Sequence, residues 1–126
     1  MNKKILIKAG NVAISAELNG TATAQAIWDA LPIKGRVNLW GDEIYFSIPV
    51  KLESENGKEL VDKGDLGYWP EGNAFCVFFG QTPISKAGEI RPASAVNIIG
   101  RVLGNTEILK QVISGTEIHI TQEANK

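Results

Sequence analysis

The sequence is poor in the residues that hold metal ions and form disulfides. Its 126 residues include one cysteine, Cys76, and one histidine, His119. A tight transition-metal site usually takes several nitrogen or sulfur ligands, so we expect no metal site and no cofactor. A single cysteine cannot form a disulfide within the chain. Cys76 lies in an apolar run and His119 on a polar strand face, so we expect a buried thiol and an exposed imidazole; a Cys76–His119 catalytic pair is the minor alternative.

The sequence also lacks an excess of either charge. Thirteen basic and fourteen acidic residues give a net charge of -1, without a clustered basic run. Nucleic-acid binding needs a concentrated positive surface, so we expect no nucleic-acid partner.

Long apolar runs are missing as well. No segment approaches the ~20 apolar residues that span a bilayer. The apolar part of the basic N-terminal stretch, Ile5 to Ile7, is too short for a signal peptide. We therefore expect no membrane partner and a cytoplasmic protein.

What is present is a series of short strand patterns in a single domain, residues 1–126, which is long enough to close one core. Apolar residues alternate in several segments, and a continuous apolar run marks a central strand buried on both faces. The predicted strands include Lys4–Lys8, Val12–Leu18, Glu43–Val50, Ala74–Phe79, Ala95–Leu103 and Glu117–Thr121. Gly10-Asn11 is the expected hairpin turn, and Gly100 indicates a bulge or a close backbone approach.

Two segments have helical periodicity instead. Thr21–Leu31 carries an apolar stripe and ends at Pro32. The segment from Thr106 to Gly115 carries a second stripe, formed by Ile108, Leu109, Val112 and Ile113. With so many strands, closure into a barrel would remove exposed sheet edges. The predicted fold is mainly β, a closed antiparallel barrel whose open ends are plugged by two α-helices.

Aromatic residues gather between positions 40 and 79, and not all of them can face one core. Tyr45 alternates away from Ile44 and Phe46, so it should point to the other face of its strand. Tyr68 and Trp69 are predicted on a turn, because glycines and Pro70 surround them.

These rings either pack under loops or form a concave apolar wall with a few polar groups, as ligand sites usually do. Glu43 shares the face of Tyr45, and Arg91 precedes a predicted strand. In the second case, a small molecule or a peptide would bind in a cleft formed by Trp40, Glu43, Tyr45, Trp69, Phe75 and Arg91.

The order of the elements, and several local stretches, resemble the cyclophilins. "FCVFFGQTP" looks like the central strand of that family, and "AVNIIGRVLGNTEILKQVISG" looks like its strand that leads into the second helix. More specifically, "WGDEIYFSIPV", "GDLGYWPEGNAFCVFFGQTPIS" and "RPASAVNIIG" are similar to a small prokaryotic cyclophilin-like family of undetermined function. The resemblance covers most of Leu6 to Thr121.

Cyclophilins isomerise prolyl bonds, whose intrinsic barrier is ~18–20 kcal/mol. The resemblance implies a catalytic arginine on the strand after the first helix, donating to the prolyl nitrogen. The position matches Trp40, or Glu43 under a shifted pairing, and neither can donate in this way. Phe75 matches the substrate-facing phenylalanine, whereas Val96 or a neighbour stands in place of the histidine.

Three hypotheses follow. The favoured one is a non-catalytic module that binds a ligand or peptide in the aromatic cleft. The second is a weak prolyl isomerase that uses Arg36 or Arg91 as the donor. The third is a subunit that packs its aromatic face against a partner chain, which includes a homodimer; cyclophilin-like domains also occur in amide-bond hydrolase assemblies.

Overall fold

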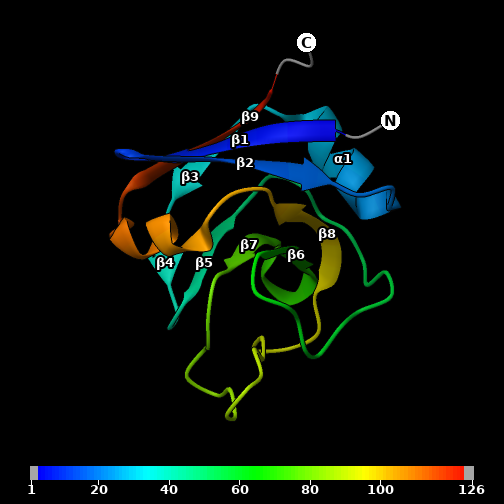
Figure 1. Ribbon diagram of the computed structural model, residues 1–126. Helices are drawn as coiled ribbons and strands as arrows, with labels where there is room; N and C mark the ends of the chain where they lie inside the picture. Colours follow the sequence, from blue (N-terminus) through cyan, green and yellow to red (C-terminus); the bar gives the residue numbers. More distant parts are fainter. Residues whose placement is uncertain (1–2, 124–126) are drawn as a thin grey trace.

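The structure is a computed structural model that describes residues 3–123 as one antiparallel sheet with short helical segments. Figure 1 shows the strands of the sheet curling round on themselves. The strands within these residues are β1 (Lys3–Ala9), β2 (Val12–Leu18), β3 (Ile33–Arg36), β4 (Asn38–Leu39), β5 (Glu43–Ser47), β6 (Asp65–Trp69), β7 (Ala74–Phe78), β8 (Asn97–Val102) and β9 (Glu117–Gln122). The helical segments are α1 (Ala22–Ala30), η1 (Pro70–Gly72) and η2 (Thr106–Gln111), of which the last two are 3₁₀-helices.

The strand order explains how the sheet curls into a nearly closed barrel. The order is β3-β9-β1-β2-β8-β6-β7-β5-β4, and its two outermost strands are consecutive in the chain, separated by Val37 alone. The sheet therefore begins and ends on one short segment. Gly35 of β3 lies against β5, where an added Cβ would come within 2.8 Å of the Phe46 ring. The predicted fold class is confirmed.

The first strands follow the predicted pattern. β1 and β2 pair from Lys3↔Leu18 to Ala9↔Val12, which leaves Gly10-Asn11 as a two-residue turn. Gly10 has a φ of +60°, as the first central residue of a type II′ turn requires. The alternate apolar residues of β2, from Val12 to Leu18, are buried.

Gly100 fulfils both expectations for its position. Leu66 pairs with Gly100 but Gly67 pairs with Ile98, so Ile99 is an extra residue that forms a bulge on β8. A Cβ at Gly100 would collide with the backbone carbonyl of Glu17 on β2.

Strand β7 separates two apolar clusters, as the continuous apolar run predicts. All five of its residues are buried. Phe75 and Val77 belong to the barrel core, whereas alternate residues face the other way into a smaller outer cluster. The buried members of this outer cluster are Val61, Ala74, Cys76, Phe78, Ile90 and Val96, with Tyr45, Trp69 and Ile98 packed against it. The aromatic residues are thus divided between two faces of the sheet.

Two local predictions need correction. The second helical segment lies where expected, but η2 is a 3₁₀-helix of six residues rather than an α-helix. Its i, i+3 spacing buries Leu109 and Val112 and leaves Ile113 72% exposed, outside the predicted stripe. Tyr68 and Trp69 do not lie on a turn: they end strand β6, and the turn begins with η1 at Pro70.

Asn97 ties the long 51–64 segment to helix α1. Its buried side-chain amide accepts a hydrogen bond from the Glu55 backbone N–H at 2.8 Å and donates to Glu53 O and Thr23 Oγ1. The Glu55 carboxylate in turn accepts from the Ala22 and Thr23 N–H groups at the start of α1. The Thr23 hydroxyl also donates to the carboxylate, at 2.6 Å, and makes the largest contribution to a lowered pKa of Glu55, to which the two N–H bonds add.

We expect Asn97→Leu to lower the free energy of unfolding by about 2 kcal/mol, because it leaves the Glu55 N–H and the Glu53 carbonyl without their partner in a part-buried place. Urea denaturation measures the loss. Asn38→Ala, at an exposed position, is the matched control and should change stability by less than about 0.5 kcal/mol. An equally small effect of Asn97→Leu would contradict this role.

Candidate functional site

A tight hairpin brings three of the predicted site residues onto one face. Trp40 and Glu43 exchange backbone hydrogen bonds across the two-residue loop Gly41-Asp42. Residues paired in this way point their side chains to the same side of the sheet, and Tyr45 follows two positions after Glu43. Gly41 has a φ of +62° and packs against the Gln81 carbonyl, which leaves no space for a side chain.

Strand β6 supplies the opposite wall. Trp69 pairs with Ala74 of β7, and its indole N–H donates a hydrogen bond of 2.6 Å to Ser94 Oγ. This bond holds the ring against the segment that precedes β8. On the same strand, a Cβ at Gly67 would lie within 3.1–3.3 Å of Val96 and Phe78, so the glycine allows Val96 to approach the sheet closely.

The segment 80–96 closes the third side. Its chain is held by its own polar groups: the Gln81 side chain donates to Lys86 O at 2.8 Å, and Thr82 Oγ1 donates to Arg91 O. Backbone hydrogen bonds also attach the segment to its neighbours. The Asp42 N–H of the hairpin donates to Gln81 O, and the Val61 N–H donates to Ile90 O. It is therefore an ordered loop of the kind that often carries function.

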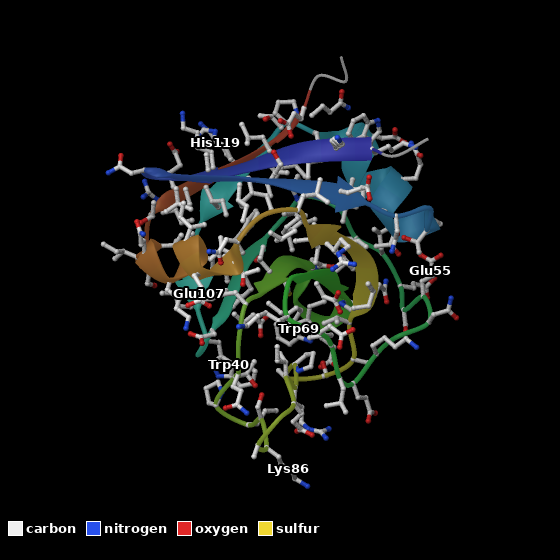
Figure 2. The ribbon with its side chains drawn as sticks, in the orientation of Figure 1. Trp40, Glu55, Trp69, Lys86, Glu107 and His119 are labelled. Carbon is white, nitrogen blue, oxygen red and sulfur yellow. The ribbon has the colours of Figure 1, made fainter. Side chains whose placement is uncertain are left out.

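These three walls surround a half-open cavity of about 280 Å³. Its lining residues are Trp40, Glu43, Tyr45, Trp69, Pro92, Ala93 and Val96. In Figure 2, Trp40 and Trp69 lie between the barrel and the loop whose far end carries Lys86, while His119 lies at the opposite end of the molecule.

Glu43 is the charged residue in this apolar lining. Its side chain is buried, and its Oε1 atom has no hydrogen-bond partner. Burial raises the pKa of Glu43 from its ordinary value of 4.5 to about 7, although hydrogen bonding with Cys76 opposes the shift. The carboxyl group therefore changes its charge near neutral pH, a property that buried acids in functional sites often have.

The Cys76 thiol lies under the cavity. Cys76 pairs with Tyr45 across β5 and β7 and is fully buried. Burial raises the pKa of this thiol well above its ordinary value, and the neighbouring Glu43 carboxylate adds to the effect. Because the reactive form of cysteine is the thiolate, Cys76 is an inert packing residue that can hydrogen-bond to Glu43.

The structure brings together four of the six predicted site residues: Trp40, Glu43, Tyr45 and Trp69. Phe75 is not among them, because it points into the barrel core, fully buried, with its ring centroid 5.6 Å from that of Phe46. Arg91 is not a lining residue either. Its guanidinium forms an ion pair with Glu89 at 2.9 Å, while the next residue, Pro92, lines the cavity.

Sequence reasoning missed Pro92, Ala93 and Val96 as cavity residues. Their positions depend on the path of the 80–96 loop, which is set by side-chain to backbone bonds rather than by periodicity. The signal that could have found them was the "RPASAV" stretch beside the aromatic strands, with small and apolar residues in a loop.

The remaining polar residues with candidate roles lie elsewhere. His119 is exposed, as predicted, and its ring contacts Glu117 at 3.1 Å on the same strand. It lines a separate, open groove over β1 and β9 together with Lys8 and Thr121. Arg36, at the end of β3, donates a hydrogen bond of 3.0 Å to the Gly115 carbonyl.

Within residues 3–123, no three acidic, histidine or cysteine side chains come together as a metal site. In the same residues, no helix is long and apolar enough to cross a membrane.

The position of the Trp69 ring depends on Gly72. A Cβ at Gly72 would lie 2.5 Å from two carbons of the indole ring. We therefore expect Gly72→Ala to displace the ring, break its bond to Ser94 and shift the indole N–H resonance in an NMR spectrum. Gly20→Ala is the matched control, because a Cβ there meets nothing within 4 Å. An unchanged Trp69 indole resonance in Gly72→Ala would show that the ring is placed otherwise.

Comparisons with known proteins identify the fold and leave the activity open. The sequence profile of the family described as cyclophilin-like matches residues 3–121. The chain is 44% identical to the hypothetical protein AF2241 from Archaeoglobus fulgidus; the alignment covers 97% of this chain and 95% of that one, with a TM-score of 0.83. It also resembles McbB, solved in complex with tryptophan, at 13% identity and a TM-score of 0.70, covering 97% of this chain and 45% of McbB. At that identity the second likeness shows the fold alone. No curated protein matches the chain.

Proposed function

The chain belongs to the cyclophilin-like family, and we propose that it is a binding protein of that family, which holds a small ligand in the cavity between the β4–β5 hairpin and the 80–96 loop. The observation that carries the proposal is a buried, unpartnered carboxyl oxygen on Glu43, a residue that lines a cavity together with three aromatic side chains. Apolar cavities with one or two polar groups are the usual form of small-molecule sites.

The size of the cavity favours a small ligand over an extended peptide. Its volume of about 280 Å³ lies just below the usual range of ligand pockets. A small metabolite, or one side chain of a peptide, fills a space of this size. McbB, which has the same fold, was solved with tryptophan, so tryptophan belongs among the compounds to test.

The isomerase alternative has less support. Catalysis of the cyclophilin kind needs a donor such as arginine beside the bound proline. The residues that line the cavity within the described part of the chain include no arginine or lysine, and Arg36 and Arg91 are engaged elsewhere. The partner-subunit alternative gains no support from the aromatic face: within residues 3–123 the exposed large apolar side chains are Leu39, Leu60, Ile84, Leu103 and Ile113, and none of them lines the cavity.

A thermal-shift screen of amino acids, amines, small carboxylic acids and short proline peptides tests the proposal. We expect at least one compound to raise the melting temperature of the wild type, and Trp69→Ala or Tyr45→Ala to abolish the shift. His119→Ala, at the other end of the molecule, is the control and should respond as the wild type does (Figure 2). If binding persists in both cavity variants, or if His119→Ala alone loses it, the ligand site lies elsewhere.

A further inference from the structure

We propose that the cavity selects a small organic ammonium: a protonated amine with an apolar substituent, whose N–H group donates to Glu43 and whose carbon skeleton packs against Trp40, Tyr45 and Trp69. This inference rests on the proposed function and adds the chemical class of the ligand.

The polar groups of the cavity call for a hydrogen-bond donor with positive charge. Glu43 lines the cavity and its Oε1 atom is buried without a partner, so a ligand N–H group that reaches the carboxyl would supply a hydrogen bond that the protein does not. An anionic ligand would be repelled by the carboxylate, and the lining offers it neither lysine nor arginine. A purely apolar ligand would leave the Glu43 oxygen unsatisfied.

The walls suit the other part of such a ligand. Three of the lining side chains are aromatic, and the electron-rich faces of tryptophan and tyrosine attract a cation that lies within about 6 Å of the ring centre. Pro92, Ala93 and Val96 complete an apolar surface for the substituent. The Trp69 indole N–H is already bonded to Ser94, so it does not compete with the ligand for Glu43.

Other ionisable groups near Glu43 leave its role undisturbed. Cys76 of β7 is held as the neutral thiol by burial, and Tyr45 lies on the same strand. Asp42 packs against the backbone at Gly80, and Arg91 is paired with Glu89. The ammonium therefore finds one counter-charge.

The pH dependence follows from this arrangement. Because burial raises the pKa of Glu43 to about 7, the carboxyl is mostly protonated at pH 6 and mostly ionised at pH 8. The ammonium binds the ionised form, so its affinity should rise about ten-fold from pH 6 to pH 8, a range over which an alkylamine remains protonated. A neutral ligand of the same size should show no such rise.

The experiment uses the Trp28→Phe protein, in which the remaining tryptophans, Trp40 and Trp69, both line the cavity. Fluorescence titrations compare phenethylammonium with 2-phenylethanol, which is neutral and of similar size, and with phenylacetate, which is anionic. We expect the ammonium to bind at least about ten-fold more tightly than the alcohol, and phenylacetate not to bind. Glu43→Gln, which keeps the shape of the side chain, should remove the preference for the ammonium and its pH dependence.

A lysine side chain carries the same chemistry as a free amine. Nα-acetyl-lysine methylamide therefore forms the second arm of the titration. Binding of this compound at least as tight as that of phenethylammonium assigns the site to lysine side chains of a polypeptide; binding of phenethylammonium alone assigns it to a free amine. Either result supports an ammonium site.

Two results would overturn the inference. The first is equal affinity for phenethylammonium and 2-phenylethanol. The second is an affinity of the wild-type protein for the ammonium that does not change with pH. Both are measured without a Glu43 variant, so neither depends on whether such a variant folds. In both cases a neutral ligand that is lost in Trp69→Ala would leave the proposed function standing. Absence of any cavity ligand in the thermal-shift screen would remove the proposed function itself.

Discussion

Glu43→Gln is expected to stabilise the protein by about 3 kcal/mol at pH 8 and to have little effect at pH 4. The pKa of Glu43 is raised to about 7 in the folded protein, against an ordinary value of 4.5. Between these values the folded state binds more protons than the unfolded state, so this group's contribution to stability is complete below pH 4.5 and is lost as the pH rises to about 7. Glutamine stays neutral, so the variant keeps this contribution to stability across the whole pH range.

The difference between variant and wild type, measured by urea denaturation from pH 4 to pH 8, isolates Glu43 from the other groups that titrate. Asp65, whose pKa is also raised by burial, contributes equally to both proteins. Glu71→Gln, at an exposed position, is the matched control and should follow the wild type across the range. A constant difference between Glu43→Gln and wild type would mean that the Glu43 carboxyl is solvated.

Phe75→Ala is expected to lower the free energy of unfolding by about 4 kcal/mol. The Phe75 ring is fully buried in the barrel core beside Phe46, and its removal leaves a void that the surrounding strands can fill only in part. Denaturant unfolding measures the loss. Ile113→Ala, at a side chain that is 72% exposed, should cost less than about 0.5 kcal/mol.

The same variant also distinguishes the core from the cavity. Where Phe75→Ala is still folded, it should keep the ligand response of the wild type, because Phe75 does not line the cavity. A small loss of stability together with a lost ligand response would place Phe75 in the site, as the sequence alone had suggested.

The contrast between Phe75 and Tyr45 shows what the sequence could predict. Tyr45 lies in an alternating strand, so its direction opposite to Ile44 and Phe46 follows from the two-residue period, and the structure agrees. Phe75 lies in a continuous apolar run that is buried on both faces, so no polar residue marks which side is the core. Its position could be read only from the pairing of β7 with its neighbours.

Strand β6 was missed for a related reason. Gly67 interrupts its apolar residues and Pro70 follows directly, which is the composition of a turn. The structure shows that Gly67 is required within the strand, because Val96 and Phe78 occupy the space of a side chain. The need for that glycine arises from a segment about thirty residues further along, which local patterns do not reveal.

The cavity could be predicted in part. Barrel closure and the face shared by Glu43 and Tyr45 follow from strand patterns, and the tight Gly41-Asp42 loop places Trp40 with them. The loop wall could not be predicted, because hydrogen bonds of Gln81, Thr82 and Ser85 fix its path.

The most direct test of the account is an NMR titration of the Glu43 side-chain carboxyl carbon, with and without phenethylammonium. A buried carboxyl beside aromatic walls, whose Oε1 atom lacks a hydrogen-bond partner, should titrate with a midpoint near 7, and the ammonium should lower that midpoint because it binds the ionised form. A midpoint near 4.5 that the ammonium leaves unchanged would contradict both the burial of Glu43 and the ligand assigned to the cavity.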